Sequence, residues 1–158
     1  MTKSINRSKE HALTIKILTD KDPNTDKAVF PTIKALQCFA AVVGFADGER
    51  KQLTRGNTEN IEWHIFENGN LTQYIYLIAL AGANEVNILK YDIESQDSRE
   101  TNNMIQIFEE YANRGFEIIT GWLNRTPTDR YGTAALLLGM RRDGFIEKAN
   151  NQFQPINF

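Results

Sequence analysis

The sequence predicts a mainly α-helical, compact domain of about five helices with two or three short strands. Its 158 residues match the size of one ordinary domain. With 41% hydrophobic and 24% charged residues, its composition is that of a folded soluble protein. Two long apolar stretches and one amphipathic stretch predict helices. We therefore expect a single domain over residues 1–158, with a polar arm at 1–10 and a tail at 150–158 as candidate flexible ends.

The first half of the chain alternates between short patterns and one long apolar run. Residues 11–18 carry apolar side chains at every second position, which predicts a strand. Residues 19–27 are rich in Asp, Asn and Pro and predict a loop. The apolar run from Thr32 to Ala46 is too long for a buried strand, so it predicts a buried helix that ends at Asp47-Gly48.

A polar, exposed loop is expected over residues 49–60, followed by a second strand with alternating Ile61, Trp63 and Ile65. A second buried helix is expected from Tyr74 to Ala83. Residues 86–91 are compatible with a strand or a helical turn.

An amphipathic helix is expected from Ser98 onward, since Met104, Ile107, Phe108 and Tyr111 share one helical face. Gln106, Glu109 and Glu110 are expected to face outward. Gly115 is interpreted as a C-cap or a break between two helices. Thr126-Pro127 predicts the start of the last helix, which runs to about Arg142 and ends at Asp143-Gly144.

Charge and cysteine content narrow the classes of function. The formal net charge of −2 argues against a protein that binds polyanions by bulk charge, although residues 61–120 are acidic and both ends are mildly basic. This distribution is typical of a polar interface, or of ends that meet the middle in the fold. Cys38 is the only cysteine, so no internal disulfide forms and a cytoplasmic location is expected. We find neither a signal peptide nor an apolar run long enough to span a membrane.

Catalytic and metal-binding signatures are missing from the sequence. His11 and His64 lie far apart, and no phosphate loop, dinucleotide fingerprint or esterase elbow occurs. We therefore predict no catalytic residue, no metal and no cofactor. Asp47, Glu49 and Lys51 are the residue types of a metal-dependent nuclease, but they follow a helix in a turn rather than lying on a rigid strand edge. A solvated loop is the favoured interpretation, and a nuclease the least favoured function.

Basic residues suggest two candidate DNA-binding surfaces. The first is the loop with Arg50, Lys51 and Arg55, where Trp63 could stack a base but is favoured as a core residue. The second comprises four arginines near the C-terminus: Arg125, Arg130, Arg141 and Arg142.

Several segments resemble the small accessory proteins of bacterial DNA-phosphorothioation (Dnd) gene clusters. They are FAAVVGF at residues 39–45, the Gly48-x-Arg50 turn, Ile61-x-Trp63, the helix at residues 78–81, and above all IFEEYANRGFEII at residues 107–119. The resemblance spans roughly residues 30–125. It implies a cytoplasmic protein that works beside the enzymes of an antiphage defence system, and it transfers no active site.

We therefore expect a non-catalytic accessory subunit that binds a larger defence-system protein, with its own copies as further candidate partners. The predicted partner-binding residues are Glu109, Glu110 and Arg114, beside the loop at residues 50–60. The alternative is a DNA-binding module of the same system that contacts phosphates through Arg50, Lys51 and Arg55.

Overall fold

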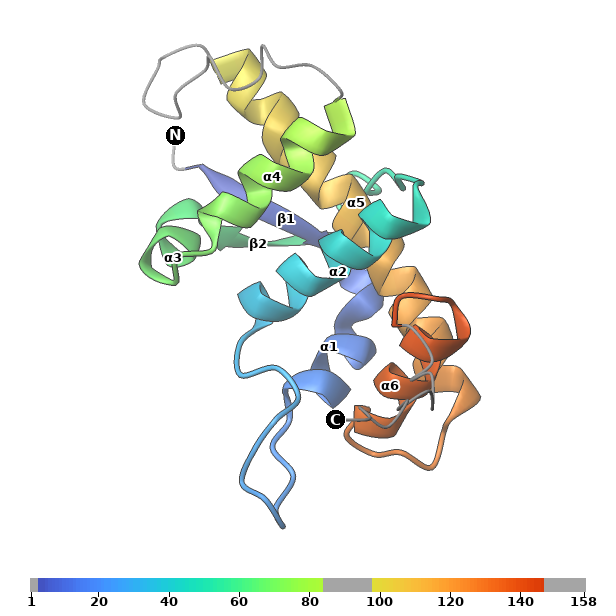
Figure 1. Cartoon of the computed structure of the whole chain (residues 1–158). Coiled ribbons are helices and arrows are strands. Elements are labelled where there is room, and N and C mark those ends of the chain that lie inside the picture. The colour runs from blue at the N-terminus through green and yellow to red at the C-terminus, as the bar shows by residue number, and fades with distance from the viewer. Residues whose placement is uncertain (1–2, 84–97, 147–158) are drawn as a thin grey trace, which may run out of the picture.

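A long central helix organises the computed structural model, which describes residues 3–83 and 98–146 (Figure 1). The fold is mainly α with one two-stranded sheet, as predicted. In chain order the elements are β1 (Ser4–Ser8), the 3-10 turn η1 (Lys9–His11), α1 (Ala12–Thr19), α2 (Ile33–Asp47), β2 (Thr58–Glu62), α3 (Trp63–Asn68), α4 (Thr72–Ala83), α5 (Ser98–Arg125) and α6 (Thr133–Arg142).

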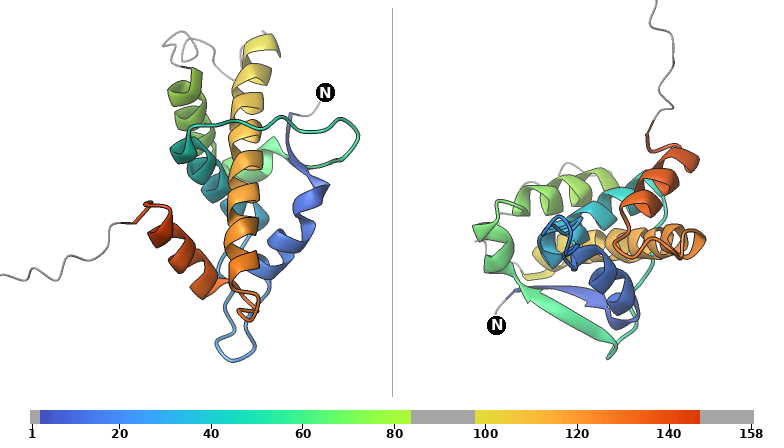
Figure 2. Two further views of the ribbon diagram at one scale, coloured as in Figure 1. Left: turned by 90° about the vertical axis from the view of Figure 1, so that its right-hand side faces the viewer. Right: turned by 90° about the horizontal axis from the view of Figure 1, so that it is seen from below.

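Helix α5 separates two layers of the molecule. Figure 2 shows α2, α4 and α6 on one side of α5, and α1 with the β1–β2 sheet on the other. Helices α2 and α5 come into backbone contact where they cross. Gly44 faces the carbonyl oxygen of Tyr111, and Gly115 faces that of Ala40, with no room for a Cβ at either glycine. Glycine is required at this crossing for packing rather than for flexibility.

The small sheet attaches the N-terminal segment to the core. β1 and β2 pair antiparallel, with Ser4 opposite Glu62 and Ser8 opposite Thr58. The free edge of β1 is covered by side chains from α2 and α5. Gln37 Nε2 donates to the Asn6 carbonyl, and the Glu109 carboxylate accepts from the Asn6 backbone N–H. The backbone groups of Asn6 are therefore satisfied without a third strand.

The predictions for the two apolar helices are confirmed. Thr32 caps α2 by accepting from the Ala35 N–H, and Gly48 ends it in a left-handed conformation with φ of 87°. α4 covers the predicted range, and Cys38 is buried on α2. Within the described residues, no helix has the length and apolar content needed to cross a membrane.

The strand prediction for residues 11–18 is wrong, because a helical face was mistaken for alternation, and the second predicted strand is displaced toward its N-terminal side. Residues 12–19 form α1, in which Ile15 and Leu18 are buried three positions apart while Leu13 is 70% exposed. β2 ends at Glu62, before Trp63 begins the short helix α3. Burial of Trp63 confirms its interpretation as a core residue.

Two boundaries in the C-terminal half also differ from prediction. α5 runs without interruption through Gly115, because this glycine permits the close approach of α2 instead of ending the helix. α6 begins at Thr133 rather than near Pro127, and the Asp129 carboxylate accepts from the Ala135 N–H in the first turn of the helix. The predicted end at Arg142 is confirmed. The segment at 86–91 and the tail at 150–158 lie outside the described residues.

Candidate functional site

Two regions were selected from the sequence: the loop at residues 50–60, and Glu109, Glu110 and Arg114 on α5. They lie side by side in the structure. The loop at residues 49–57 runs along α5, and its backbone is bound there. Lys51 N–H donates to the Glu110 carbonyl at 3.1 Å, and Asn113 Nδ2 donates to the carbonyls of Lys51 and Gln52 at 3.1 Å each. The mildly basic end therefore meets the acidic middle of the chain, one of the two arrangements predicted from the charge distribution.

Two of the three loop cations are paired with acids. Arg50 Nε lies 3.5 Å from the Glu110 carboxylate, and its guanidinium lies 6.0 Å from the centroid of the Tyr111 ring. Lys51 Nζ lies 3.2 Å from Glu117 and 3.6 Å from Glu10. The contact with Glu117 raises the pKa of Lys51. Arg55 is exposed and forms no ion pair with the described part of the chain.

Glu109 and Glu110 do not face outward as expected. Glu110 is 6% exposed, and its carboxylate accepts from Gln106 Nε2 at 2.9 Å. Glu109 is half-buried and accepts from the backbone and side-chain nitrogens of Asn6 at 2.6 and 3.0 Å. Burial raises the pKa of Glu109 to about 7 despite these hydrogen bonds. The sequence expectation is wrong because β1 and the loop cover this face of α5.

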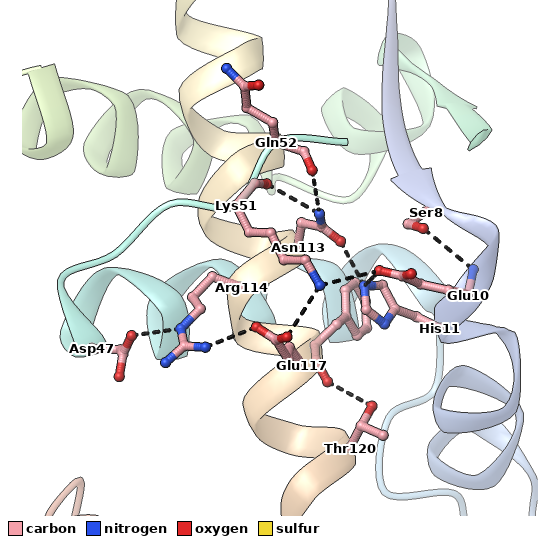
Figure 3. Close-up of polar contacts among 11 residues, drawn as sticks. Ser8, Glu10, His11, Asp47, Lys51, Gln52, Asn113, Arg114, Glu117 and Thr120 are labelled. Atoms are coloured by element: carbon pink, nitrogen blue, oxygen red, sulfur yellow. Dashed lines mark hydrogen bonds and ion pairs between the residues drawn. The ribbon is translucent and has the colours of Figure 1, made fainter. Parts of the chain in front are cut away.

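Arg114 remains partly accessible, beside the end of α2. Its Nε donates to Asp47 at 2.7 Å and its Nη1 donates to Glu117 at 2.8 Å. These carboxylates raise the pKa of Arg114, and Arg114 in turn is the main cause that lowers the pKa of Glu117. Figure 3 shows Asp47 directed at Arg114 and Lys51 directed at Glu10 and Glu117. The nuclease-like grouping of Asp47 and Lys51 is thus divided between different ion pairs.

A buried hydrogen-bonded pair, His11 and Asn113, lies at the centre of these polar contacts and was not predicted from the sequence. His11 is 4% exposed, and its Nε2 lies 2.6 Å from Asn113 Oδ1 (Figure 3). Asn113 Nδ2 already donates to two carbonyls, so Oδ1 is the acceptor and His11 Nε2 carries the proton. Burial lowers the pKa of His11, whose ring stacks on Phe116 with centroids 5.1 Å apart.

The hydrogen bonds of this network connect three separate parts of the chain. His11, Asn113 and Lys51 join η1, α5 and the loop through hydrogen bonds and ion pairs. His11 is separated from Asn113 by 102 positions, so no local pattern could have revealed the pair. Asn113 itself gave no distinctive signal, because it is one of many polar residues in an amphipathic helix.

A cleft of about 750 Å³ lies next to Arg114. Its floor is the C-terminal half of α5, where Gly121 leaves open space, and its walls are the end of α2 and residues 143–145. Trp122 Nε1 donates to the Asp143 carboxylate at 2.6 Å, which joins one wall to the floor. Arg125 also lines this cleft.

An apolar surface lies along α2 and α4. Val42 is 44%, Tyr74 41% and Leu77 61% exposed, which is high for such side chains. Between α2 and α4 is a groove of about 290 Å³ whose lining residues are all uncharged: Ala35, Cys38, Phe39, Val42, Leu71 and Tyr74. We call Val42, Tyr74, Leu77 and these lining residues the α2–α4 surface.

Comparison with known proteins extends the resemblance seen in the sequence. Residues 4–158 match the model of a family described as DNA sulphur modification system-associated protein 4, well beyond residues 30–125. No curated protein and no solved structure matches the chain.

Proposed function

Because the chain belongs to the family of DNA sulphur modification system-associated protein 4, we propose that it is a non-catalytic accessory subunit of such a system. In this proposal it works in the cytoplasm and binds a larger protein component of the system. Association with a modification system supports the presence of other components as partners.

The distribution of polar contacts supports an interaction role. His11, Lys51, Asn113 and Glu110 are engaged with side chains or backbone groups of the same chain. Side chains held this way stabilise the fold. The partner is therefore expected elsewhere than at Glu109 and Glu110, and Arg114 is the member of the predicted partner-binding set that keeps an accessible side chain.

The observation that carries the proposal is the α2–α4 surface. Its exposed side chains surround a groove without charged lining residues, so the surface favours an uncharged, apolar occupant. We assign this occupant to the larger system protein, in the form of a segment that presents apolar side chains. Burial of aromatic and aliphatic side chains in such a groove is a usual source of binding energy.

Replacement of Leu77 by Asp tests the proposal. The full-length protein is co-expressed with the other products of its gene cluster and recovered by affinity purification with mass spectrometry. A charge at Leu77 should reduce recovery of the larger protein roughly tenfold, because the carboxylate would lose its hydration in the interface. The matched control is Leu13→Asp, since Leu13 is also an exposed helical leucine, 70% exposed, but lies on α1.

The outcomes separate the alternatives. The proposed surface is contradicted if both variants lose the larger protein equally, or if both recover it as well as the wild type does. A purified protein that forms dimers by itself, and loses them in Leu77→Asp, assigns the groove to a second copy instead. A wild-type chain that recovers no neighbouring gene product contradicts the accessory role as a whole.

A further inference from the structure

The C-terminal arginines form a charged surface that the accessory role does not use. Between residues 124 and 146 there are four arginines and two aspartates, a formal charge of +2. All four arginines are exposed, and none of them pairs with an acid in the described part of the chain. We propose that this arginine surface, made of Arg125, Arg130, Arg141 and Arg142, binds the phosphate backbone of duplex DNA.

The fold places Arg125 in the large cleft and places Arg141 and Arg142 next to residues of its wall. α6 returns along α5, so that Gly139 lies against the Trp122 ring without room for a Cβ, and Asp143 accepts from Trp122 Nε1. Arg141 and Arg142 immediately precede Asp143, and Arg125 lies one helical turn beyond Trp122. Arg125 lines the 750 Å³ cleft together with Asp143 and Gly144, so Arg141 and Arg142 directly precede a wall of the cleft that Arg125 also lines.

The acids near this surface are already engaged. Asp129 accepts from the Ala135 N–H at the start of α6, and Asp143 accepts from Trp122. On the cleft wall, Asp47 and Glu117 are paired with Arg114. The ion pairs with Arg114 offset part of the negative charge of Asp47 and Glu117, whereas the four arginine side chains remain available to an external anion.

The loop with Arg50, Lys51 and Arg55 provides the contrast. Arg50 and Lys51 already contact Glu110, Glu117 and Glu10, so binding a phosphate there would require breaking these ion pairs. The C-terminal surface requires no such exchange. DNA is the anion we favour over an acidic protein, because guanidinium groups bind phosphate in a bidentate way and the family is associated with a DNA modification system.

The test is a pair of triple variants that remove the same charge. Binding of the full-length protein to a 30-base-pair duplex is measured by fluorescence anisotropy between about 50 and 200 mM salt. Arg125→Ala/Arg141→Ala/Arg142→Ala should weaken binding roughly tenfold or more and reduce the salt slope by about 3, one for each lost phosphate contact. Arg50→Ala/Lys51→Ala/Arg55→Ala should bind within about twofold of the wild type.

Thermal unfolding of both variants confirms that each is folded before its affinity is interpreted. Equal weakening by the two triple variants would indicate bulk charge, and stronger weakening by the loop variant would assign DNA to the loop; either result overturns the proposal. Absence of wild-type binding at 50 mM salt, or equal binding of a polyglutamate of the same charge, overturns it as well. The outcome does not depend on the proposed protein partner, since neither triple variant changes the α2–α4 surface.

Discussion

The two faces of α5 are stabilised in opposite ways. Against α2, the Tyr111 carbonyl of α5 faces Gly44, and Gly115 of α5 faces the Ala40 carbonyl. This contact depends on the lack of side chains at the two glycines. Against the loop at residues 49–57 and the N-terminal segment, it presents Glu109, Glu110 and Asn113, and the contact depends on hydrogen bonds. The first face tolerates no added atom, whereas the second tolerates any group with the same donors and acceptors.

The largest expected effect belongs to the glycine face. Gly115→Ala places a methyl group against the Ala40 carbonyl, so the helices must move apart along their most extensive contact. We expect a loss of at least about 3 kcal/mol in the free energy of unfolding, measured by urea denaturation. Gly121→Ala is the control on the same helix, because its added Cβ meets nothing and should stabilise by up to about 1 kcal/mol. Similar effects of the two variants would show that helix propensity, rather than close packing, determines the result.

An intermediate effect is expected from Asn113→Ala on the polar face. The variant removes three hydrogen bonds and leaves His11 and two loop carbonyls without their partner, at a cost of about 2 to 3 kcal/mol. Asn124→Ala serves as the control, since Asn124 is exposed on the same helix and should change the stability by less than about 0.5 kcal/mol. Hydrogen exchange of the amides at residues 51–57 should rise only in Asn113→Ala. Unchanged protection there would argue against Asn113 as the attachment of the loop.

The smallest effect, and the one that depends on pH, concerns Glu109. Its pKa is about 7 in the fold against an ordinary value of 4.5, so between these pH values the folded chain keeps a proton that the unfolded chain has released. This group therefore lowers the free energy of unfolding as pH rises from 4.5 to 7. Glu109→Gln should be nearly equal to the wild type at pH 4 and more stable than it at pH 8 by about 2 kcal/mol, which is below the roughly 3 kcal/mol of the full shift because solvent screens the half-buried side chain.

His11 acts in the opposite direction, which makes the comparison between variant and wild type necessary. Burial lowers the pKa of His11, so its contribution to stability is lost as pH falls below about 6.5. The difference between Glu109→Gln and the wild type cancels this common term. Glu49→Gln, at an exposed loop position, should show no such difference at any pH. A constant difference between pH 4 and pH 8 would refute the raised pKa of Glu109.

The local sequence pattern predicted a helix correctly where its apolar face is long enough to be recognised. The apolar run of α2 and its end at Gly48 were predicted from the sequence, as was the apolar stripe of α5. The same reasoning failed at α1, where eight residues are compatible with either period until the core selects one. It also misread Gly115, since the reason for that glycine is a carbonyl on another helix.

The sequence by itself determined the fold class, the buried helices, the single buried cysteine and the family to which the chain is similar. These properties follow from composition, periodicity and motifs, which are local. Only the tertiary structure decided that Glu110 is buried, that His11 meets Asn113, and that Arg125 lines the same cleft as Asp47. Each of these depends on residues tens of positions apart, and the position of one helix on another is determined by the packing of the whole core rather than by the residues at the site.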